Sequence, residues 1–229
     1  MPNWTQPFKN LLNIFLQSNC PFCQRPTTRE ICLDCGRQLQ QCHLKNPKAL
    51  WKQPLPVFAW GKYDGMLKQA IAAMKYDNHP EIARVLGQYL GQAWLSHPPE
   101  DNSQPIVVPI PLHKTKLKER GYNQAALIAE NFCLVTGLQL KPQGLQRNRQ
   151  TTAQFSLSAQ ERQQNLTDAF SLGSGFRRLP KSPILLVDDI YTTGATAKSA
   201  IATLEKSGIQ VCGLAAVART AQGRGPRIY

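Results

Sequence analysis

Long apolar runs are missing from this sequence: none approaches the roughly 20 residues that a membrane-spanning helix needs. The first residues also lack the basic start, the continuous apolar block and the small-residue cleavage site of a signal peptide. We therefore expect no membrane insertion and a cytoplasmic location. In that reducing compartment, the seven cysteines are expected to be thiols or metal ligands rather than disulfides.

Acidic residues are scarce, because 14 Asp and Glu stand against 27 Lys and Arg, which gives a formal net charge of +13. This excess favours an anionic partner, either nucleic acid or a polyphosphate substrate, although a basic surface without a specific partner also fits. The usual nucleotide loops are missing too, since neither GxxxxGK[ST] nor GxGxxG occurs. The hydrophobic fraction of 42% over 229 residues is enough for one globular domain with an appendage.

The most informative stretch is residues 183–200, PILLVDDIYTTGATAKSA. Its apolar run, 184–187, is typical of a buried parallel strand, which delivers the residues behind it to the ligand crevice of an α/β sheet. Two acids, Asp188 and Asp189, follow the run. A loop then leads into a predicted helix, and it consists of Thr192, Thr193, Gly194, Ala195 and Thr196.

This loop is suited to a phosphate. Gly194 permits close backbone approach, and hydroxyl and N–H groups at a helix N-terminus provide donors. The acids would repel the same phosphate and so need another task. They could accept hydrogen bonds from vicinal ribose hydroxyls or hold a metal-bound diphosphate. The alternative is a plain strand, turn and helix in which the aspartates are caps.

Two cysteine pairs lie near the N-terminus in the pattern C-x2-C-x8-C-x2-C, formed by Cys20, Cys23, Cys32 and Cys35. Such pairs place four thiolates tetrahedrally around Zn²⁺ in structural sites. We therefore predict a structural zinc ribbon, with four reduced thiols and no metal as the alternative. Cys42 and His43 follow shortly afterwards and are open as further ligands.

The remaining pattern predicts alternating strands and helices. We expect strands over 57–63, 106–110 and 211–218, and helices over 4–16, 66–74, 81–95 and 122–134. Residues 113–121 are expected to form a basic loop at the same sheet edge as the phosphate loop, where Lys114 and Arg120 would suit a diphosphate.

Residues 141–165 are polar and are expected to form a long loop. The loop could be a lid that carries Arg147, Arg149 and Arg162, or an ordinary disordered surface segment.

These elements predict an α/β fold with a central, mostly parallel sheet flanked by helices, plus a small N-terminal module. We divide the chain into an N-terminal helix and zinc-ribbon module (1–56), a strand and helices that link to or hood the core (57–105), and the core itself (106–229). The acid pair and its loop, within 184–196, belong to the core.

The segment LLVDDIYTTGAT resembles the phosphoribosyl-pyrophosphate (PRPP) motif of type I phosphoribosyltransferases. In that family the acid pair binds the ribose hydroxyls and the Thr/Gly loop binds the 5′-phosphate. The resemblance implies that Asp188 and Asp189 are ribose ligands and that 192–196 is the phosphate loop. It also implies a phosphoribosyltransferase-like core.

A second resemblance rests on the order of five segments: the double CxxC, WGKYDGMLKQAIAAMKY, VVPIPLHKTKLKERGYNQA, RNRQTTAQFSLSAQERQQN and LLVDDIYTTGAT. This order, over about residues 20–218, is similar to the ComF (ComFC/GntX) family of competence proteins. It assigns Arg120, Asn123 and Gln124 to an RGxNQ signature and Lys75 to a K-Y element. The family implies a role in natural transformation, handling single-stranded DNA beside a helicase-like partner, without naming an acceptor substrate.

Two functions follow from these resemblances. The first is an enzyme that binds PRPP with Mg²⁺ and displaces pyrophosphate, with Asp188, Asp189, Arg120 and Lys75 as catalytic residues and Lys114 as a further ligand. The second is a non-catalytic module that keeps the fold and binds single-stranded DNA or a protein partner. The basic loops contain few aromatics for base stacking, which weakens direct DNA recognition.

Overall fold

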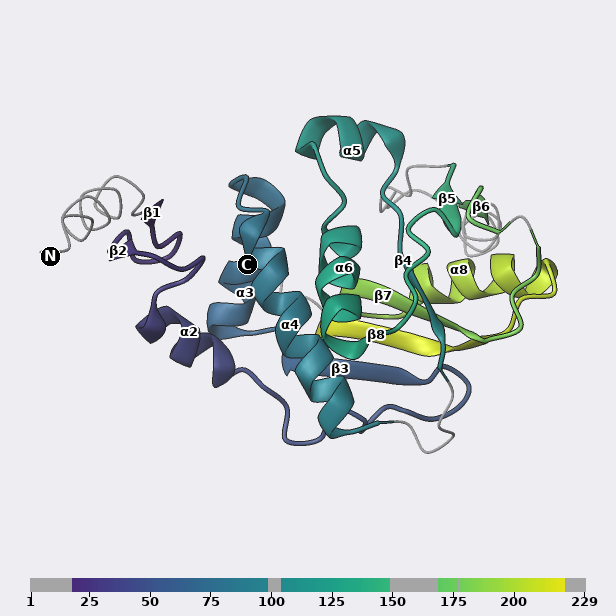
Figure 1. The fold of residues 1–229 in the computed structure, drawn as a ribbon, viewed down its shortest axis with the longest axis horizontal. Coiled ribbons are helices and arrows are strands. Elements are labelled where there is room, and N and C mark those ends of the chain that lie inside the picture. The colour runs from purple at the N-terminus through teal and green to yellow at the C-terminus, as the bar shows by residue number, and fades with distance from the viewer. Residues whose placement is uncertain (1–17, 99–103, 149–168, 177, 221–229) are drawn as a thin grey trace, which may run out of the picture.

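The computed structural model describes residues 18–98, 104–148, 169–176 and 178–220, and its centre is a four-stranded parallel sheet. The strand order is β3 (Val57–Lys62), β8 (Val211–Arg219), β7 (Ile184–Tyr191) and β4 (Ile106–Pro109). Figure 1 shows helices α3 (Gly65–Tyr76), α4 (Glu81–Ser96) and α6 (Gln124–Thr136) on one side of this sheet. The predicted α/β fold with a parallel sheet flanked by helices is therefore confirmed.

The other face of the sheet is covered by α8 (Ala195–Lys206) and by a two-stranded sheet of β5 (Leu145–Arg147) and β6 (Phe170–Leu172). Because both faces of β7 are covered, its residues 184–187 are all fully buried. Leu185 and Val187 pack on the side of α4 and α6, whereas Ile184 and Leu186 pack on the side of α8. The sequence correctly predicts this buried parallel strand, and β7 continues through the acid pair.

The cysteine module consists of the short strands β1 (Ser18–Asn19) and β2 (Pro26–Thr27) and the helix α2 (Leu33–Gln40). Cys20, Cys35 and Leu39 belong to the same buried cluster as the apolar faces of α3 and α4. The module is therefore packed directly on the helical layer. Since β3 pairs with β8, the segments 57–105 and 106–229 contribute strands to one sheet.

Two expectations about loops are wrong. Residues 113–121 contain a helix, α5 (Lys114–Arg120), which His113 caps by accepting a hydrogen bond from the Thr115 N–H at 3.3 Å. The segment KTKLKER consists mostly of good helix formers, and its charge masked that preference. The polar stretch 141–165 is not all loop either, because β5 lies within it and pairs with β6.

Other predicted elements match closely or fall outside the described ranges. The helices and strands predicted between residues 57 and 134, and the strand over 211–218, are present within a few residues of their expected ends. The predicted helix over 4–16, the stretch 149–165 and its Arg149 and Arg162 lie outside the described residues. Within the described ranges, no helix is long and apolar enough to cross a membrane.

Two glycines of α4 allow it to lie close against α6. A methyl group at Gly87 would come within 2.5 Å of the Ile128 carbonyl oxygen, and one at Gly91 within 2.8 Å of Val135 Cβ. Such distances are too short for a Cβ, so these glycines set the spacing of the two helices.

We expect Gly87→Ala to lower the free energy of unfolding by about 1–3 kcal/mol, because the added methyl overpacks the α4–α6 contact. Gly36→Ala in α2 is the matched control, since its Cβ would meet only the Tyr89 hydroxyl, at 4.0 Å. The control should be neutral or gain up to about 1 kcal/mol from helix propensity. Denaturant unfolding measures both, and equal values for the two variants would contradict the close contact.

Candidate functional site

The acid pair lies at the C-terminal edge of the sheet, where parallel strands present their ligand-binding loops. Asp188 and Asp189 are in the last half of β7, and the 192–196 loop follows it directly into α8. The neighbouring strand β4 leads at the same edge into α5. The sequence prediction that these segments share one edge is consistent with the strand order.

Asp189 is buried, with 4% of its surface exposed, and its Oδ2 forms an ion pair with Lys75 Nζ at the end of α3. Its Oδ1 accepts a hydrogen bond from the Ile190 N–H at 2.9 Å. Asp188 Oδ1 accepts one from the Asp189 N–H at 2.8 Å. Backbone donors therefore fix both carboxylates, and the cation at Asp189 comes from a helix far away in the sequence.

Burial raises the pKa of Asp188 well above its ordinary value, and the adjacent charge of Asp189 raises it further, while Lys75 acts in the opposite direction. Burial lowers the pKa of Arg147 in β5, and the charge of Asp188 opposes that shift. Two acids and two cations are thus close enough to influence one another. A strongly shifted carboxyl of this kind in a crevice is typical of functional sites.

Asp188 and the Thr/Gly loop line the same small pocket, with a volume of about 40 Å³. This is larger than the roughly 10–15 Å³ that a single water needs. Gly194 starts α8 with a φ of 76°, and a Cβ there would lie 2.9 Å from Tyr191 Cε2. Only glycine fits this turn without strain. The first residues of α8, Ala195, Thr196 and Ala197, line the pocket as well.

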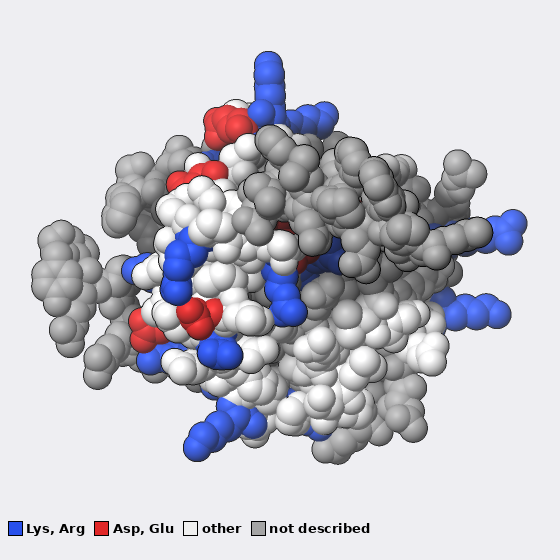
Figure 2. Space-filling view, turned by 60° about the vertical axis from the view of Figure 1, so that its left-hand side comes forward, with Lys and Arg blue, Asp and Glu red and all other residues white. Residues whose placement is uncertain are grey.

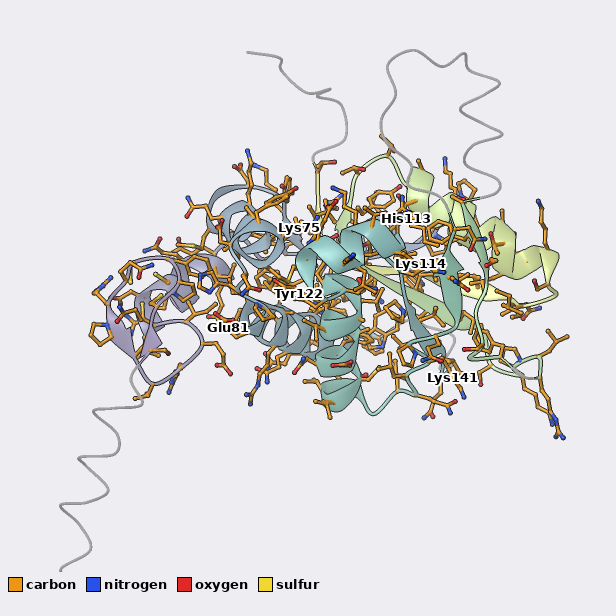
Figure 3. All side chains as sticks on the ribbon, turned by 90° about the horizontal axis from the view of Figure 1, so that it is seen from above. Lys75, Glu81, His113, Lys114, Tyr122 and Lys141 are labelled. Atoms are coloured by element: carbon orange, nitrogen blue, oxygen red, sulfur yellow. The ribbon has the colours of Figure 1, made fainter. Side chains whose placement is uncertain are left out.

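The end of α3 is held in place by the α5–α6 junction. The Tyr122 hydroxyl donates to the Met74 carbonyl, and the Arg120 guanidinium carbon lies 5.9 Å from the centre of the Tyr76 ring. Arg120 also donates to the buried Gln124 side chain. Figure 3 shows Lys75, His113 and Tyr122 on neighbouring segments of this region, with Lys141 on the opposite side of the view.

The structure brings together Asp188, Asp189, Lys75 and the loop 192–196. Arg120 instead contacts Tyr76 and Gln124, and Lys114 is exposed in the first turn of α5. Asn123 of the RGxNQ signature has a structural task. It caps α6 by accepting from the Ala125 N–H at 3.1 Å, and it donates to the Ile110 carbonyl at 3.0 Å.

The sequence predicts Arg147 in a long polar loop, which is either a lid or an ordinary disordered surface segment. The structure places it in β5, where its guanidinium lies 5.4 Å from the centre of the Phe170 ring and its charge acts on Asp188. A strand of three residues is too short to show a period in the sequence, so the signal was absent.

The four predicted cysteines form one cluster, in which all Sγ atoms lie within 4.8 Å of one another. A tetrahedral Zn²⁺ site with bonds of about 2.3 Å would space its sulfurs by about 3.8 Å, so the cluster can hold such a metal. Hydrogen bonds from Arg25 lower the pKa of Cys23 to about 6, which favours the thiolate. None of the seven cysteines, all of which lie in the described ranges, forms a disulfide.

Cys42 and His43 lie outside this cluster. The Cys42 thiol is directed at the carbonyl oxygens of Gln38 and Asp64, at 3.8 and 3.7 Å. The His43 ring packs on Trp60, with ring centres 5.8 Å apart. Among the described residues, the candidate metal ligands are therefore the four cysteines of the cluster. Cys42 and His43 contribute to packing instead.

The raised pKa of Asp188 predicts a pH-dependent cost in stability. The folded state binds the Asp188 proton more tightly than the unfolded state, so stability falls as pH rises above about 3.9, the ordinary value, toward the raised pKa. Asp188→Asn removes the charge and should raise the free energy of unfolding at pH 7 by roughly 0.5–2 kcal/mol. This gain should shrink as the pH falls toward 4.

Denaturant unfolding at pH 7 and pH 4.5 measures this effect. Asp64→Asn is the control, because Asp64 is exposed and the side chain of Lys62 lowers its pKa, so its loss should slightly destabilise the protein at pH 7. An Asp188→Asn variant that is less stable than the wild type at pH 7 would contradict the assigned environment.

No family model matches the sequence. Among solved structures, the chain is similar to an allosteric regulatory enzyme of purine biosynthesis, with a TM-score of 0.42, 16% identity, and coverage of 65% of this chain and 30% of that one. It is also similar to adenine phosphoribosyltransferase from Leishmania donovani, with a TM-score of 0.39, 11% identity, and coverage of 85% and 88%. This chain thus spans about a third of the length of the first structure.

Curated relatives are more similar. The chain is 31% identical to competence protein F of Haemophilus influenzae, over 89% of this chain and 93% of that protein. It is 31% identical to the DNA utilization protein YhgH of Salmonella typhimurium, over 83% and 79%. It is 27% identical to competence protein ComFC of Bacillus subtilis, over 82% and 72%. Because the identity to competence protein F is 31% over 89% of this chain and 93% of that protein, the chain belongs to the ComF family of competence proteins.

Proposed function

We propose that this protein binds PRPP, or a related phosphoribosyl ligand, together with Mg²⁺ at the C-terminal end of β7. The observation that carries the proposal is the pocket shared by Asp188 and the loop 192–196. The lining of that pocket combines the carboxylate of Asp188 with the hydroxyl and backbone N–H groups of the loop. A ligand that carries both a diol and a phosphate is complementary to these two kinds of group.

The ribose half of the ligand is assigned to the acids and the loop. Asp188 and Asp189 accept hydrogen bonds from the two ribose hydroxyls, since backbone N–H groups already hold one oxygen of each carboxylate in position. The 5′-phosphate is bound by Thr192, Thr193, Gly194, Ala195 and Thr196 at the N-terminus of α8. The helix dipole favours the negative charge there.

The diphosphate half needs cations. We assign Lys114 and Arg120 of α5 to this part of the ligand, as the sequence predicts, and add Arg147, which acts on Asp188 from β5. Mg²⁺ prefers oxygen ligands and keeps several waters, so it would be carried mainly by the diphosphate oxygens. When bound, the metal supplies charge neutralisation of the leaving pyrophosphate.

If the protein is an enzyme, the bond between the anomeric carbon and the pyrophosphate oxygen breaks, and a nucleophile forms a new bond to that carbon. The transition state has oxocarbenium character, so the protein acts by positioning the ribose and neutralising charge. We assign these roles to Asp188, Asp189, Arg120 and Lys75. Lys75 is held at the site by its ion pair with Asp189.

The names of the relatives, which are competence and DNA utilization proteins, support a role in DNA uptake. We propose that this role is in natural transformation, in the cytoplasm and beside a helicase-like partner, as the family resemblance implies. The net charge of +13 supports the second function, a non-catalytic module for single-stranded DNA or a protein partner. Figure 2 shows Lys and Arg side chains spread around one face, with acidic residues among them on the described surface. Basic residues there are distributed rather than gathered in one stripe.

We expect calorimetric titration with PRPP and Mg²⁺ to give saturable binding to the wild type. The double variant Asp188→Ala, Asp189→Ala should bind about 10- to 100-fold more weakly, because charge-assisted hydrogen bonds to the ribose are lost. Asp64→Ala is the matched control, since Asp64 is an exposed aspartate that pairs with Lys62 instead. Equal affinity in wild type and double variant, or no binding to either, would rule out the proposed site.

The enzyme and the binding module are separated by pyrophosphate release. Release from bound PRPP in the presence of candidate acceptors supports the enzyme. Binding of PRPP without release, together with binding of single-stranded DNA that weakens steeply as salt rises, supports the module.

We also propose that the cysteine cluster holds a structural Zn²⁺. The purified protein should contain about one zinc per chain by elemental mass spectrometry, and Cys35→Ser should lose the metal and unfold at lower denaturant, because zinc binding contributes folding free energy. Cys42→Ser should keep the metal, since its thiol faces carbonyl oxygens. Retention of full zinc in Cys35→Ser, or its loss in Cys42→Ser, would contradict the four-cysteine assignment.

A further inference from the structure

We propose that Tyr76 and Arg120 form a stacking subsite for a nucleobase, beside the phosphoribosyl site. The proposal rests on the proposed function in one respect, which is that the neighbouring site binds a phosphoribosyl ligand. Neither residue lies in the acid pair or in the phosphate loop, and they are far apart in the sequence. The fold brings an aromatic ring and a guanidinium plane together at the end of α3.

Tyr76 is the last residue of α3, and 77% of its surface is exposed. The other large aromatic residues of this region are partly or fully buried: Phe58, Trp60, Tyr63, Tyr89 and Tyr122. The guanidinium of Arg120 lies over the Tyr76 ring, with its carbon 5.9 Å from the ring centre. It can cover only one face of the ring, so most of the remaining surface is available to a planar ligand.

Arg120 is held in this position rather than being a freely rotating surface side chain. It donates a hydrogen bond to the Gln124 side chain, which is 5% exposed and lies in the first turn of α6. The left-handed Gly121 ends α5 directly after Arg120 and turns the chain toward α6. A guanidinium fixed against an aromatic ring presents two planar groups, and both stack well on nucleobases.

The position of this pair relates it to the phosphoribosyl site. Lys75, next to Tyr76 in the chain, forms the ion pair with the buried Asp189. The Tyr122 hydroxyl binds the Met74 carbonyl and so fixes the same helical turn. The last turn of α3 therefore contributes one residue to the acid pair and presents the next one to solvent.

The charges nearby favour a nucleobase that is linked to phosphate. Lys116 is one helical turn before Arg120 on the exposed helix α5, so it lies on the same face of that helix. Lys118 is two residues from Arg120 and lies on the other face. Proteins that bind single-stranded nucleic acids combine an aromatic ring, on which a base stacks, with a nearby cation that binds the phosphate. Tyr76 and Lys116 offer this combination.

The test measures binding of adenine and of a short oligodeoxyadenylate to the full-length protein, by saturation-transfer NMR for the free base and fluorescence anisotropy for the labelled strand. Variants are Tyr76→Leu, Tyr76→Phe and, as an exposed apolar control, Leu134→Ser, since Leu134 is 82% exposed on α6. PRPP affinity and thermal midpoint are measured for each variant in parallel.

We expect Tyr76→Leu to weaken binding of at least one probe about 10-fold, with Tyr76→Phe near wild type, because stacking needs the ring and not the hydroxyl. Leu134→Ser should bind as the wild type does. Loss with adenine alone identifies a free-base subsite, and loss with the strand identifies a nucleic-acid contact. If the strand is the ligand, Lys116→Ala should weaken binding of the strand more than Lys118→Ala does.

Absence of binding of both probes to the wild type, or equal binding by wild type and Tyr76→Leu, would overturn the subsite. Either result leaves the PRPP titration unaffected, so the failure of this proposal is distinguishable from the failure of the proposed function. If PRPP does not bind and adenine or the strand still requires the Tyr76 ring, the subsite stands and the phosphoribosyl site fails. Tyr76→Leu could also lose PRPP affinity by the same factor as it loses probe affinity. That result would show a general disturbance of α3, and it would overturn the stacking subsite.

Discussion

The ion pair between Lys75 and Asp189 is the interaction on which the rest of the site depends. A buried carboxylate without a partner is costly, and the cost exceeds what one or two backbone hydrogen bonds return. Asp189 has that partner because α3 ends beside the C-terminal edge of β7. The end of α3 must therefore be fixed accurately, and the hydrogen bond from Tyr122 to Met74 fixes it from the α5–α6 junction. The RGxNQ segment thus supports the acid pair from a distance.

The cysteine module packs against the helix that presents Lys75 to the acid pair. Cys20, Cys35 and Leu39 share one buried cluster with α3 and α4, so the module is continuous with the layer that presents Lys75. A segment this short, with two-residue strands and one helix of eight residues, buries little apolar surface of its own. A bound metal and the contact with α3 and α4 would both stabilise it.

Features of the fold and of the site could be predicted from the sequence where the residues that form them are close together in the chain. The run 184–187, the adjacent acids and the Thr/Gly loop are contiguous, and so they predicted a buried strand and a ligand loop that the structure contains. The cysteine spacing was equally local. Two features were not: the pairing of Arg147 with β6, and the contact between Arg120 and Tyr76. Each joins residues whose separate contexts are ordinary. The helix α5 was missed for another reason, since its charges resemble those of a solvated loop.

The environment of Asp188 has a consequence for how a ligand would bind. Burial and the neighbouring Asp189 raise the pKa of Asp188, so its carboxyl favours the protonated form more than an exposed aspartate does. A ribose diol donates hydrogen bonds and therefore needs the ionised carboxylate as acceptor. Binding of a diol ligand with its cation is then linked to loss of a proton from Asp188, and affinity rises with pH until that carboxyl is ionised in the free protein. A carboxyl that served only as a helix or turn cap would have no reason to lie in this environment, because its raised pKa costs stability at neutral pH. The charge of Asp188 therefore costs the fold stability at neutral pH, and a bound diol with its cation would offset that cost.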